Sequence, residues 1–409
     1  MPSQVILRWA AVSVFMIAGI LSYLDRQVLA ALAPTLKREF QLSNTQYGGL
    51  VSAFFLLYSI AAPFAGLFID MVGLNTGAVT AVTVWSVACA AAGLVQSLPA
   101  LMVCRMGLGL GESGAVPAGA KAGAMYLEPE ELGLRGAAGA VDIAIGSTAA
   151  PLLVAALAPV YGWRSVFLFC GLLGLFWAPL WLYTARRIPP QAKWSRSREA
   201  PGWTLLRNRQ LLSVAVAFGL GLAYYSLWAN WTTVYLVEAR HMSQLEANRQ
   251  FAWIPPVFAM LGALSSGVLT FYWIRRGVGA LTARLRACWL FVPLLLVGAA
   301  VPFLPSATLA VAAIGISLLG FQSILNNIMI MPLDLFGSRP AAFSTSLLIS
   351  AGAAAQALMS PLIGALVDRY GFTAVCVGAP LLPLLGIWLV QLSLGEEANR
   401  AAKPGAPGY

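Results

Sequence analysis

Asp25 and Arg26 stand side by side in "LSYLDRQVLAALAP", an otherwise apolar run over residues 21–34. Adjacent residues of a helix point about 100° apart, so the two charges can serve different tasks. Arginine stays protonated and presents a planar fork of N–H donors that matches a carboxylate. A carboxyl group in a low-dielectric cavity can take up and release a proton near neutral pH. The pair therefore predicts an anion-binding arginine beside a proton-carrying acid.

A second charged pair, Arg105 and Glu112, lies in "LPALMVCRMGLGLGESGAVPAG". Seven residues are about two helical turns, so both side chains share one face, roughly 10 Å apart along the axis. That separation is too long for a direct ion pair but suits two groups that line one cavity. Asp142, in "GAAGAVDIAIGSTAAP", adds a further acid. Charges inside a membrane cost about 2.5–3.5 kcal/mol each and mark function unless they only hold helices together.

Aromatic and amide side chains complete the predicted cavity wall. Tyr23 lies one turn before Arg26, and Tyr58 lies in "AFFLLYSIAAP". Hydroxyl, indole and amide groups would hydrogen-bond a hydroxylated cargo, although packing or anchoring at the membrane surface explains each aromatic equally well alone. From the second half of the chain we predict a contribution from Tyr224, Trp228, Asn230 and Trp231 in "AYYSLWANW", and from Gln322, Asn326 and Asn327.

Composition places these residues in a membrane protein. Of the 409 residues, 59% are hydrophobic and only 10% are charged, against about 25% charged in an ordinary soluble domain. Apolar stretches of about 20 residues, the length of one helical crossing, recur throughout. The sequence predicts an all-α polytopic membrane protein with twelve transmembrane helices, at about residues 8–33, 46–69, 75–96, 99–126, 136–159, 164–185, 210–236, 250–273, 285–304, 307–333, 341–367 and 372–394.

A polar stretch divides these spans six and six. The segments "PLLVAALAPVYGW" from Pro151 and "PLIGALVDRYGF" from Pro361 fall at corresponding places on either side of it, as expected for a carrier built from two repeated halves. We therefore predict an N-terminal six-helix half (1–185), a cytoplasmic linker (186–209), a C-terminal six-helix half (210–394) and a cytoplasmic tail (395–409).

Basic residues predict the orientation. The polar stretch and its flanks are rich in lysine and arginine: Arg186, Arg187, Lys193, Arg196, Arg198, Arg207 and Arg209. The loop after the eighth span holds Arg275, Arg276, Arg284 and Arg286, whereas loops on the opposite side hold fewer. The positive-inside rule places both loops and both termini in the cytoplasm. This asymmetry accounts for the net charge of +10, so we expect the lipid bilayer, and no nucleic acid, as a partner.

Other chemistries lack the residues they need. The single histidine, His241, lies in a polar loop, and the cysteines lie in apolar segments without metal-like spacing: Cys89, Cys104, Cys170, Cys288 and Cys376. Because no nucleophile–base constellation or metal cluster can be placed, we expect no enzyme activity, no metal and no cofactor. Residues 109–114 match G-x-G-x-x-G, but a dinucleotide site needs a preceding strand. Small residues inside a membrane span favour close helix packing instead.

Several stretches together resemble one branch of a known family: "YLDRQVLAALAPTLKREFQLSNTQYG", "FLLYSIAAPFAGLFID", "CRMGLGLGESGAVPAGAKA" and "MPLDLFGSRPAAFSTSLL". They resemble the anion:cation symporters of the major facilitator superfamily, and among these the bacterial hexuronate and aldonate transporters. The resemblance covers nearly the whole chain. Its strongest motifs are Tyr-Leu-Asp-Arg in the first span and Arg-x6-Glu in the fourth.

The resemblance implies roles at matching positions. It implies that Arg26 binds the substrate carboxylate, that Tyr23 and Tyr58 contact the substrate, that Asp25 and Glu112 exchange protons, and that Arg105 is the family's fourth-helix arginine. The chain also departs from the pattern. The superfamily's basic signature between the second and third spans is reduced to "DMVGLNTG", in which Asp70 and Gly73 remain but no arginine follows. Asp142 stands where such relatives carry an uncharged residue, so it is a further candidate for proton coupling.

These features predict a proton-coupled symporter of a bacterial inner membrane. It would import a small organic anion such as a hexuronate or aldonate, as a monomer with protons as the coupling ion, by alternating access of its two halves. Two alternatives stay open. An efflux carrier for organic cations or drugs would favour cavity carboxylates without two arginines. A substrate sensor would keep the fold but transport nothing, and accumulation of labelled substrate in proteoliposomes distinguishes it from a carrier.

Overall fold

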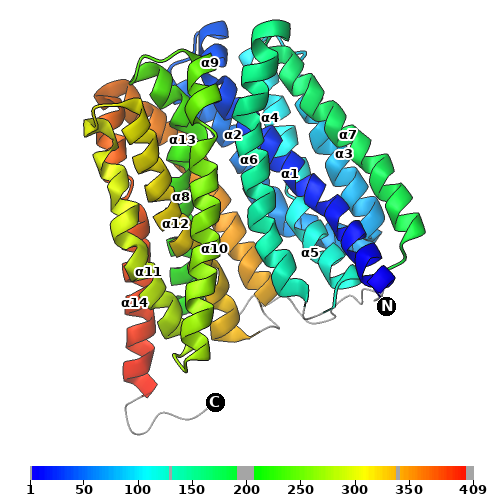
Figure 1. Cartoon of the computed structure of the whole chain (residues 1–409), viewed down its shortest axis with the longest axis vertical. Coiled ribbons are helices and arrows are strands. Elements are labelled where there is room, and N and C mark those ends of the chain that lie inside the picture. The colour runs from blue at the N-terminus through cyan, green and yellow to red at the C-terminus, as the bar shows by residue number, and fades with distance from the viewer. Residues whose placement is uncertain (1, 129–130, 191–206, 338–340, 402–409) are drawn as a thin grey trace.

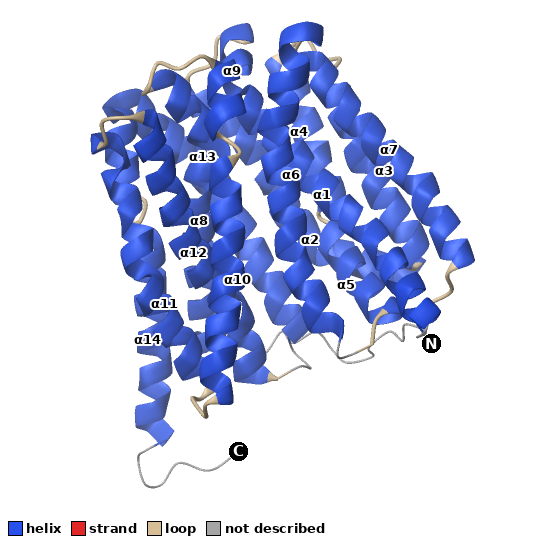
Figure 2. Ribbon diagram, viewed as in Figure 1, coloured by secondary structure: helices blue, strands red, loops and turns tan. Residues whose placement is uncertain are grey.

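The computed structural model describes residues 2–128, 131–190, 207–337 and 341–401, nearly all of them in helices (Figure 2). The N-terminal half comprises α1 Pro2–Glu39, α2 Asn44–Val72, α3 Leu74–Ala92, α4 Leu98–Glu112, α5 Ala115–Tyr126, α6 Leu132–Tyr161 and α7 Trp163–Arg187. The C-terminal half comprises α8 Arg209–Glu238, α9 Gln244–Glu246, a π-helical turn Ala247–Phe251, α10 Ile254–Arg275, α11 Ala280–Leu296, a 3₁₀ helix Val297–Phe303, α12 Ala307–Phe336, α13 Ala341–Gly378 and α14 Leu381–Ala401.

The predicted class, an all-α polytopic membrane protein, is confirmed. Ten helices among the described residues are long and apolar enough to cross a membrane, and Leu381–Leu394 forms a shorter apolar helix. The predicted fourth span is divided between α4 and α5. Pro117, in the first turn of α5, has no N–H for the carbonyl of Ser113, which explains the break at this place. The count of twelve crossings therefore stays a prediction.

The internal repeat seen in the sequence corresponds to a repeated turn. Gly162, between α6 and α7, has φ +79°, and Gly371, within α13, has φ +70°. Glycine is favoured at both positions because an added side chain would be strained there. Gly371 marks a kink inside α13, so the predicted twelfth span begins in the same helix in which the eleventh ends.

The two halves stand side by side (Figure 1). The start of α1 and the end of α14 lie at one end of the bundle, at the bottom of Figure 1. We call the opposite end, where α2 begins and α8 ends, the distal end. Helices α2 and α13 pack closely across the halves, as do α1 with α8 and α6 with α10. Most of the predicted linker and tail lies outside the described residues, so their boundaries and the side of the membrane that each end faces stay predictions.

Candidate functional site

Arg26, at the middle of α1, lies in a cage of aromatic rings. Its guanidinium carbon is 4.9 Å from each of the ring centroids of Tyr23, Phe54 and Tyr58. Its Nε donates to Glu112 of α4 in an ion pair. Within the described part of the chain, Nη1 and Nη2 have no hydrogen-bond partner, and the side chain keeps 16% exposure. The outer fork of the guanidinium is therefore available to a carboxylate.

Glu112 is the last residue of α4 and is fully buried. Its Oε2 accepts from Ser22 Oγ at 2.9 Å and from Arg26. Ser22 and Arg26 lie one turn apart on α1, so one helix face supplies both donors. Its Oε1 is buried without a partner among the described residues. The carboxylate is thus held from one side only, and its arginine partner is also the predicted substrate ligand.

Asp25 is buried where α1 packs near α3 and α4. It is 0% exposed, and neither carboxylate oxygen has a hydrogen-bond partner in the part of the chain that the structure describes. Cys89 of α3 and the two groups Arg105 and Glu112 of α4 lie within electrostatic range. Burial of an unpaired charge is costly. The protonation state of Asp25 should therefore respond to changes in its surroundings.

Arg105 also lies against the ring of Phe54. Its guanidinium carbon is 5.0 Å from the Phe54 centroid, and its Nε and Nη1 are buried with no partner among the described residues. Phe54, itself fully buried, therefore contacts both predicted arginines. It was not among the predicted residues, although its i, i+4 spacing to Tyr58 is a signal that places both rings on one face of α2.

The glycines of α4 bring this helix onto its neighbours, as the sequence predicted. An ideal Cβ on Gly109 would lie 2.3 Å from the carbonyl oxygen of Phe54, and one on Gly111 would lie 2.6 Å from the amide nitrogen of Trp85. Neither contact is possible for a side chain, so close packing of α4 against α2 and α3 requires glycine here. This approach brings Arg105 close to the ring of Phe54 and Glu112 to Arg26.

Asp142 of α6 packs onto α1 one turn before Tyr23. It is 3% exposed, and an ideal Cβ on Gly19 would lie 3.2 Å from its Oδ2. Tyr23 is within electrostatic range. The missing side chain at Gly19 makes room for this acid, which thereby reaches the edge of the Arg26 cage.

Of the neighbouring tyrosines on α8, the structure brings Tyr225 rather than Tyr224 toward Arg26. Tyr224 is fully buried inside the C-terminal half, where its hydroxyl bonds Ser317 Oγ at 2.5 Å. Tyr225 stacks on Phe321 with ring centroids 5.7 Å apart and lies within electrostatic range of Tyr23 and Arg26. Residues three, four and seven positions after Tyr225 line a cavity between the halves. This helical spacing could have identified Tyr225 from the sequence.

A small cavity lies between the halves beside Arg26. Its volume is about 30 Å³, and its walls include Gln27 and Ser147 from one half and Tyr225 and Trp228 from the other. Such a volume holds about one water molecule, not a sugar acid. The halves are therefore closed together at this level, and Trp228 contributes to their contact as well as to the predicted site.

The three predicted amide side chains of α12 differ in their hydrogen bonds and in their exposure. Asn326 Nδ2 donates to the Ala263 carbonyl and to Ser266 Oγ, both at 3.4 Å, and Asn327 Nδ2 donates to the Ser323 carbonyl at 2.8 Å. These amides bond within the C-terminal half. Gln322 is partly exposed. The structure does not bring Asn326 to Arg26, and its predicted substrate role stays a prediction.

Asn230 and Trp231 of α8 lie at the contact with α2. The backbone carbonyl of Asn230 accepts from the Tyr47 hydroxyl at 2.8 Å, and the ring of Trp231 lies 5.0 Å from that of Tyr47 in an edge-on arrangement. The Asn230 amide bonds back to Ser226. Both residues therefore join the two halves.

A lysine of α5 supplies the partner that the shortened loop signature lacks. Lys121 Nζ donates to Asp70 Oδ1 at 3.0 Å and to the Ile69 carbonyl at 3.1 Å. Its side chain is 5% exposed. The end of α2 is thus tied to α5, although no arginine follows Asp70 in the sequence.

These elements define a class: a polytopic helical membrane protein with two halves and a buried set of opposite charges beside their interface, the arrangement of a carrier. The chain belongs to the Major Facilitator Superfamily, whose family model matches residues 15–342. It is therefore a transporter and not an enzyme, and the resemblance stated from the motifs is confirmed.

The relatives and one solved structure agree with this assignment. The hexuronate transporter of Escherichia coli (strain K12) is 26% identical over 97% of this chain and 98% of its own length. The galacturonate transporter of Dickeya chrysanthemi is 30% identical over 64% of this chain and 81% of its own. A bacterial homolog to the human lysosomal transporter Spinster, solved in an inward-facing and occupied conformation, is 17% identical, covers 95% of this chain and 97% of its own, and gives a TM-score of 0.78. This structural likeness shows the fold.

Proposed function

We propose that the chain is a proton-coupled symporter that imports a sugar acid of the hexuronate or aldonate class. The observation that carries the proposal is the guanidinium of Arg26, which is fixed by three aromatic rings and by Glu112 while its outer nitrogens have no partner in the described chain. A planar fork of donors is the group best suited to a carboxylate. The names of the hexuronate and galacturonate transporters support the substrate class.

Substrate contacts come from both halves in this proposal. The carboxylate binds Arg26, and the hydroxyl groups of Tyr23 and Tyr58 are placed around it to bond the sugar. From the C-terminal half, Tyr225, which lies within electrostatic range of Arg26, and Trp228 line the small cavity, and Gln322 is a partly exposed amide. A substrate that binds residues of both halves stabilises the conformation in which the halves close around it, and alternating access requires such a conformation.

Coupling follows from competition for one arginine. A bound carboxylate takes over Arg26, so Glu112 loses its positive partner and keeps only the Ser22 hydroxyl. Protonation of Glu112 then becomes favourable, because a buried carboxylate without a partner is costly. By reciprocity, protonation of Glu112 frees Arg26 and strengthens substrate binding. Asp25, whose carboxylate oxygens have no hydrogen-bond partner among the described residues, and Asp142, at the edge of the cage, are the further proton carriers.

The transport cycle assigns a side to each end of the bundle. We place both termini in the cytoplasm of a bacterium and the distal end outside, following the basic loops. In the described conformation the distal end holds hydrogen bonds across the halves, such as Gln244 and Asn248 to the Ala31 carbonyl at 3.0 and 2.9 Å. Rocking of the halves would part this end and expose Arg26 to the outside. The carrier acts as a monomer and needs no cofactor besides protons.

Transport by purified protein tests the proposal. Proteoliposomes with an acidic exterior are given labelled glucuronate, galacturonate, gluconate or galactonate in turn, with an aromatic acid as a non-sugar control. We expect at least one sugar acid to accumulate above its external concentration, and accumulation to stop when a protonophore collapses the pH difference. Binding without accumulation would favour the sensor. Export of an organic cation in exchange for protons would favour the efflux carrier.

A further inference from the structure

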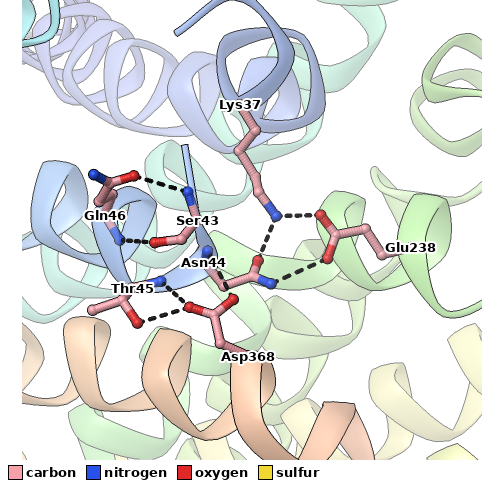
Figure 3. A network of polar contacts seen from close by, with 7 residues as sticks. All are labelled: Lys37, Ser43, Asn44, Thr45, Gln46, Glu238 and Asp368. Carbon is pink, nitrogen blue, oxygen red and sulfur yellow. Dashed lines mark hydrogen bonds and ion pairs between the residues drawn. The ribbon is translucent and has the colours of Figure 1, made fainter. Parts of the chain in front are cut away.

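At the distal end, a carboxylate of one half caps a helix of the other (Figure 3). Asp368 of α13 accepts hydrogen bonds from the backbone N–H groups of Asn44 at 3.0 Å and Thr45 at 2.9 Å, and from Thr45 Oγ1 at 2.8 Å. Asn44 and Thr45 form the first turn of α2. The cap of α2, a helix of the N-terminal half, is therefore completed by a residue of the C-terminal half.

The first turn of α2 has its own cap, but that cap is incomplete. Ser43 Oγ accepts from the Gln46 amide at 3.1 Å, and the Gln46 side chain accepts from the Ser43 amide at 3.0 Å. A helix start leaves several N–H groups without intrahelical acceptors, and this capping box does not serve those of Asn44 and Thr45. Asp368 serves both and places a negative charge at the positive end of α2. Docking of the halves thus completes the cap.

A second set of contacts shares Asn44. Lys37 of α1 forms an ion pair with Glu238 of α8, which belongs to the opposite half. Lys37 Nζ also donates to Asn44 Oδ1 at 2.5 Å, and Asn44 Nδ2 donates to Glu238 Oε2 at 3.4 Å. Asn44 therefore joins both sets, through its backbone to Asp368 and through its amide to Lys37 and Glu238 (Figure 3).

Two glycines bring α2 and α13 close enough for the cap. An ideal Cβ on Gly364 would lie 2.2 Å from the Asn44 carbonyl oxygen, and one on Gly48 would lie 2.3 Å from the Ser360 carbonyl oxygen. Only glycine permits these approaches. Gly364 lies one turn before Asp368, so the same helix face supplies the close approach and the capping carboxylate.

The internal repeat does not place a second capping carboxylate at the equivalent position of the N-terminal half. Counted from the repeated prolines, Pro151 and Pro361, the residue that matches Asp368 is Ala158. Around Ala158 the distal end is open rather than sealed. A cavity of about 730 Å³ lies there, with Pro159 in one wall and Gln244 of the other half in another. The capping carboxylate is thus found on the α2–α13 side, whereas Lys37 and Glu238 lie at the wall of this cavity.

We propose that Asp368 and Asn44, with Lys37 and Glu238, form a latch that holds the distal end shut and is released in each transport cycle. The proposal rests on the proposed function in one respect, since a latch has a purpose only if the halves alternate. When α2 and α13 part, the Asn44 and Thr45 amides lose their acceptor and turn to water. Removal of the Asp368 charge should therefore shift the carrier toward the state that is open at this end.

Alkylation of a reporter cysteine measures the opening directly. Ser360 is fully buried on α13 against Gly48, so Ser360→Cys should react with a charged maleimide only when α2 and α13 separate. The full-length protein is studied in lipid nanodiscs without any substrate, and the reaction of the native cysteines is subtracted. In this background Asp368→Asn should raise the alkylation rate by about tenfold, the population change expected for loss of one charge-assisted hydrogen bond. Asp368→Glu, which keeps the carboxylate, should stay close to the parent.

A carboxylate outside the latch provides the control. Glu39 pairs with Arg164 at 3.1 Å near the same end, but both residues belong to the N-terminal half. Glu39→Gln should leave the rate unchanged. Glu238→Gln is the second latch variant, for the case that Asp368→Asn does not elute as a folded monodisperse protein. Equal rates in the parent and in the folded latch variants, or an equal rise in Glu39→Gln, would overturn the latch. Because the assay contains no cargo and no pH gradient, its outcome is independent of whether the cargo is a sugar acid.

Discussion

Arg26 of α1 and Glu112 of α4 form a buried ion pair, although they lie eighty-six positions apart in the chain. Arg105, in the same helix as Glu112, has no carboxylate partner in the described part of the chain, although Asp25 and Glu112 lie within its electrostatic range. The site therefore holds one engaged and one unengaged arginine. A cargo carboxylate can exchange places with Glu112 at Arg26 without creating a net charge, provided that a proton arrives with it.

Arg26→Lys should weaken substrate binding by about ten- to a hundredfold, because an ammonium group keeps the charge but loses the bidentate hydrogen bonds. Calorimetric titration of purified protein with a transported sugar acid measures the loss. Arg38→Lys is the matched control, since Arg38 is exposed near the distal end and should change nothing. Wild-type affinity in Arg26→Lys would remove Arg26 from the binding site.

Phe54→Leu should weaken substrate binding and lower the thermal stability, because the ring contacts both Arg26 and Arg105. Each cation–π contact in a desolvated place contributes about 1–2 kcal/mol. Thermal unfolding in detergent and substrate titration are the two measurements. Phe64→Leu, on the same helix but 66% exposed, controls for the general loss of a ring. An equal fall in both variants would show that Phe54 is only a packing residue.

Asp70→Asn should destabilise the protein by about 3 kcal/mol, because it removes the negative charge with which the buried Lys121 ammonium forms an ion pair. Lys121→Met should cost less, since Asp70 is 31% exposed and can be hydrated. The double variant should be more stable than Asp70→Asn alone. Unfolding midpoints of the three variants form a double-mutant cycle, and additive effects would show that the two residues do not interact.

The ends of α10 provide the test of orientation. A reporter inserted beside Gly277 should read cytoplasmic, and one inserted beside His241 should read external, because the basic residues Arg275 and Arg276 flank the first position. Alkaline phosphatase and green fluorescent protein fusions report the two sides with opposite signals. An inverted pair would place the latch on the cytoplasmic side and reverse the direction of the cycle.

The sequence was sufficient for the fold class and for selecting the charged residues that the structure brings together in the N-terminal half. Charges inside apolar spans are rare, so Asp25, Arg26, Arg105 and Glu112 could be selected by residue type alone, and helical spacing placed them around one region. The C-terminal half offers no such charges. Whether Tyr224 or Tyr225 faces Arg26 depends on how α8 is rotated about its own axis. That rotation is set by the packing of other helices.

Two further contacts could not be inferred from residue type alone. Lys121 and Asp70 are fifty-one positions apart, and no periodicity links the ends of two separate helices. Phe54 is apolar in an apolar helix, so its residue type alone indicates packing rather than a site. Its contact with both arginines follows from the close approach of α4 at Gly109.

The coupling mechanism makes the most specific prediction. Glutamine at position 112 mimics the protonated acid, and its neutral amide no longer holds Arg26 by charge. Glu112→Gln should therefore bind substrate at least as well as the parent and exchange labelled for unlabelled substrate across the membrane. It should not accumulate substrate when the exterior is made acidic, because the proton no longer has a site to occupy. Asp25→Asn should behave in the same way.

Exchange and uphill uptake are compared in the same proteoliposomes, so that a loss of folding, which abolishes both, is separated from a loss of coupling, which abolishes only the second. Asp334→Asn is the control. Asp334 pairs with Arg284 between α11 and α12, away from the aromatic cage, and its loss should not separate exchange from uptake. If the double variant Glu112→Gln, Asp25→Asn still accumulates substrate under an imposed pH difference, the coupling protons are carried elsewhere, and Asp142 becomes the remaining acid of the site to test. Retained exchange without accumulation would support the competition of Glu112 and the cargo for Arg26, because only that competition links proton uptake to substrate binding at one guanidinium.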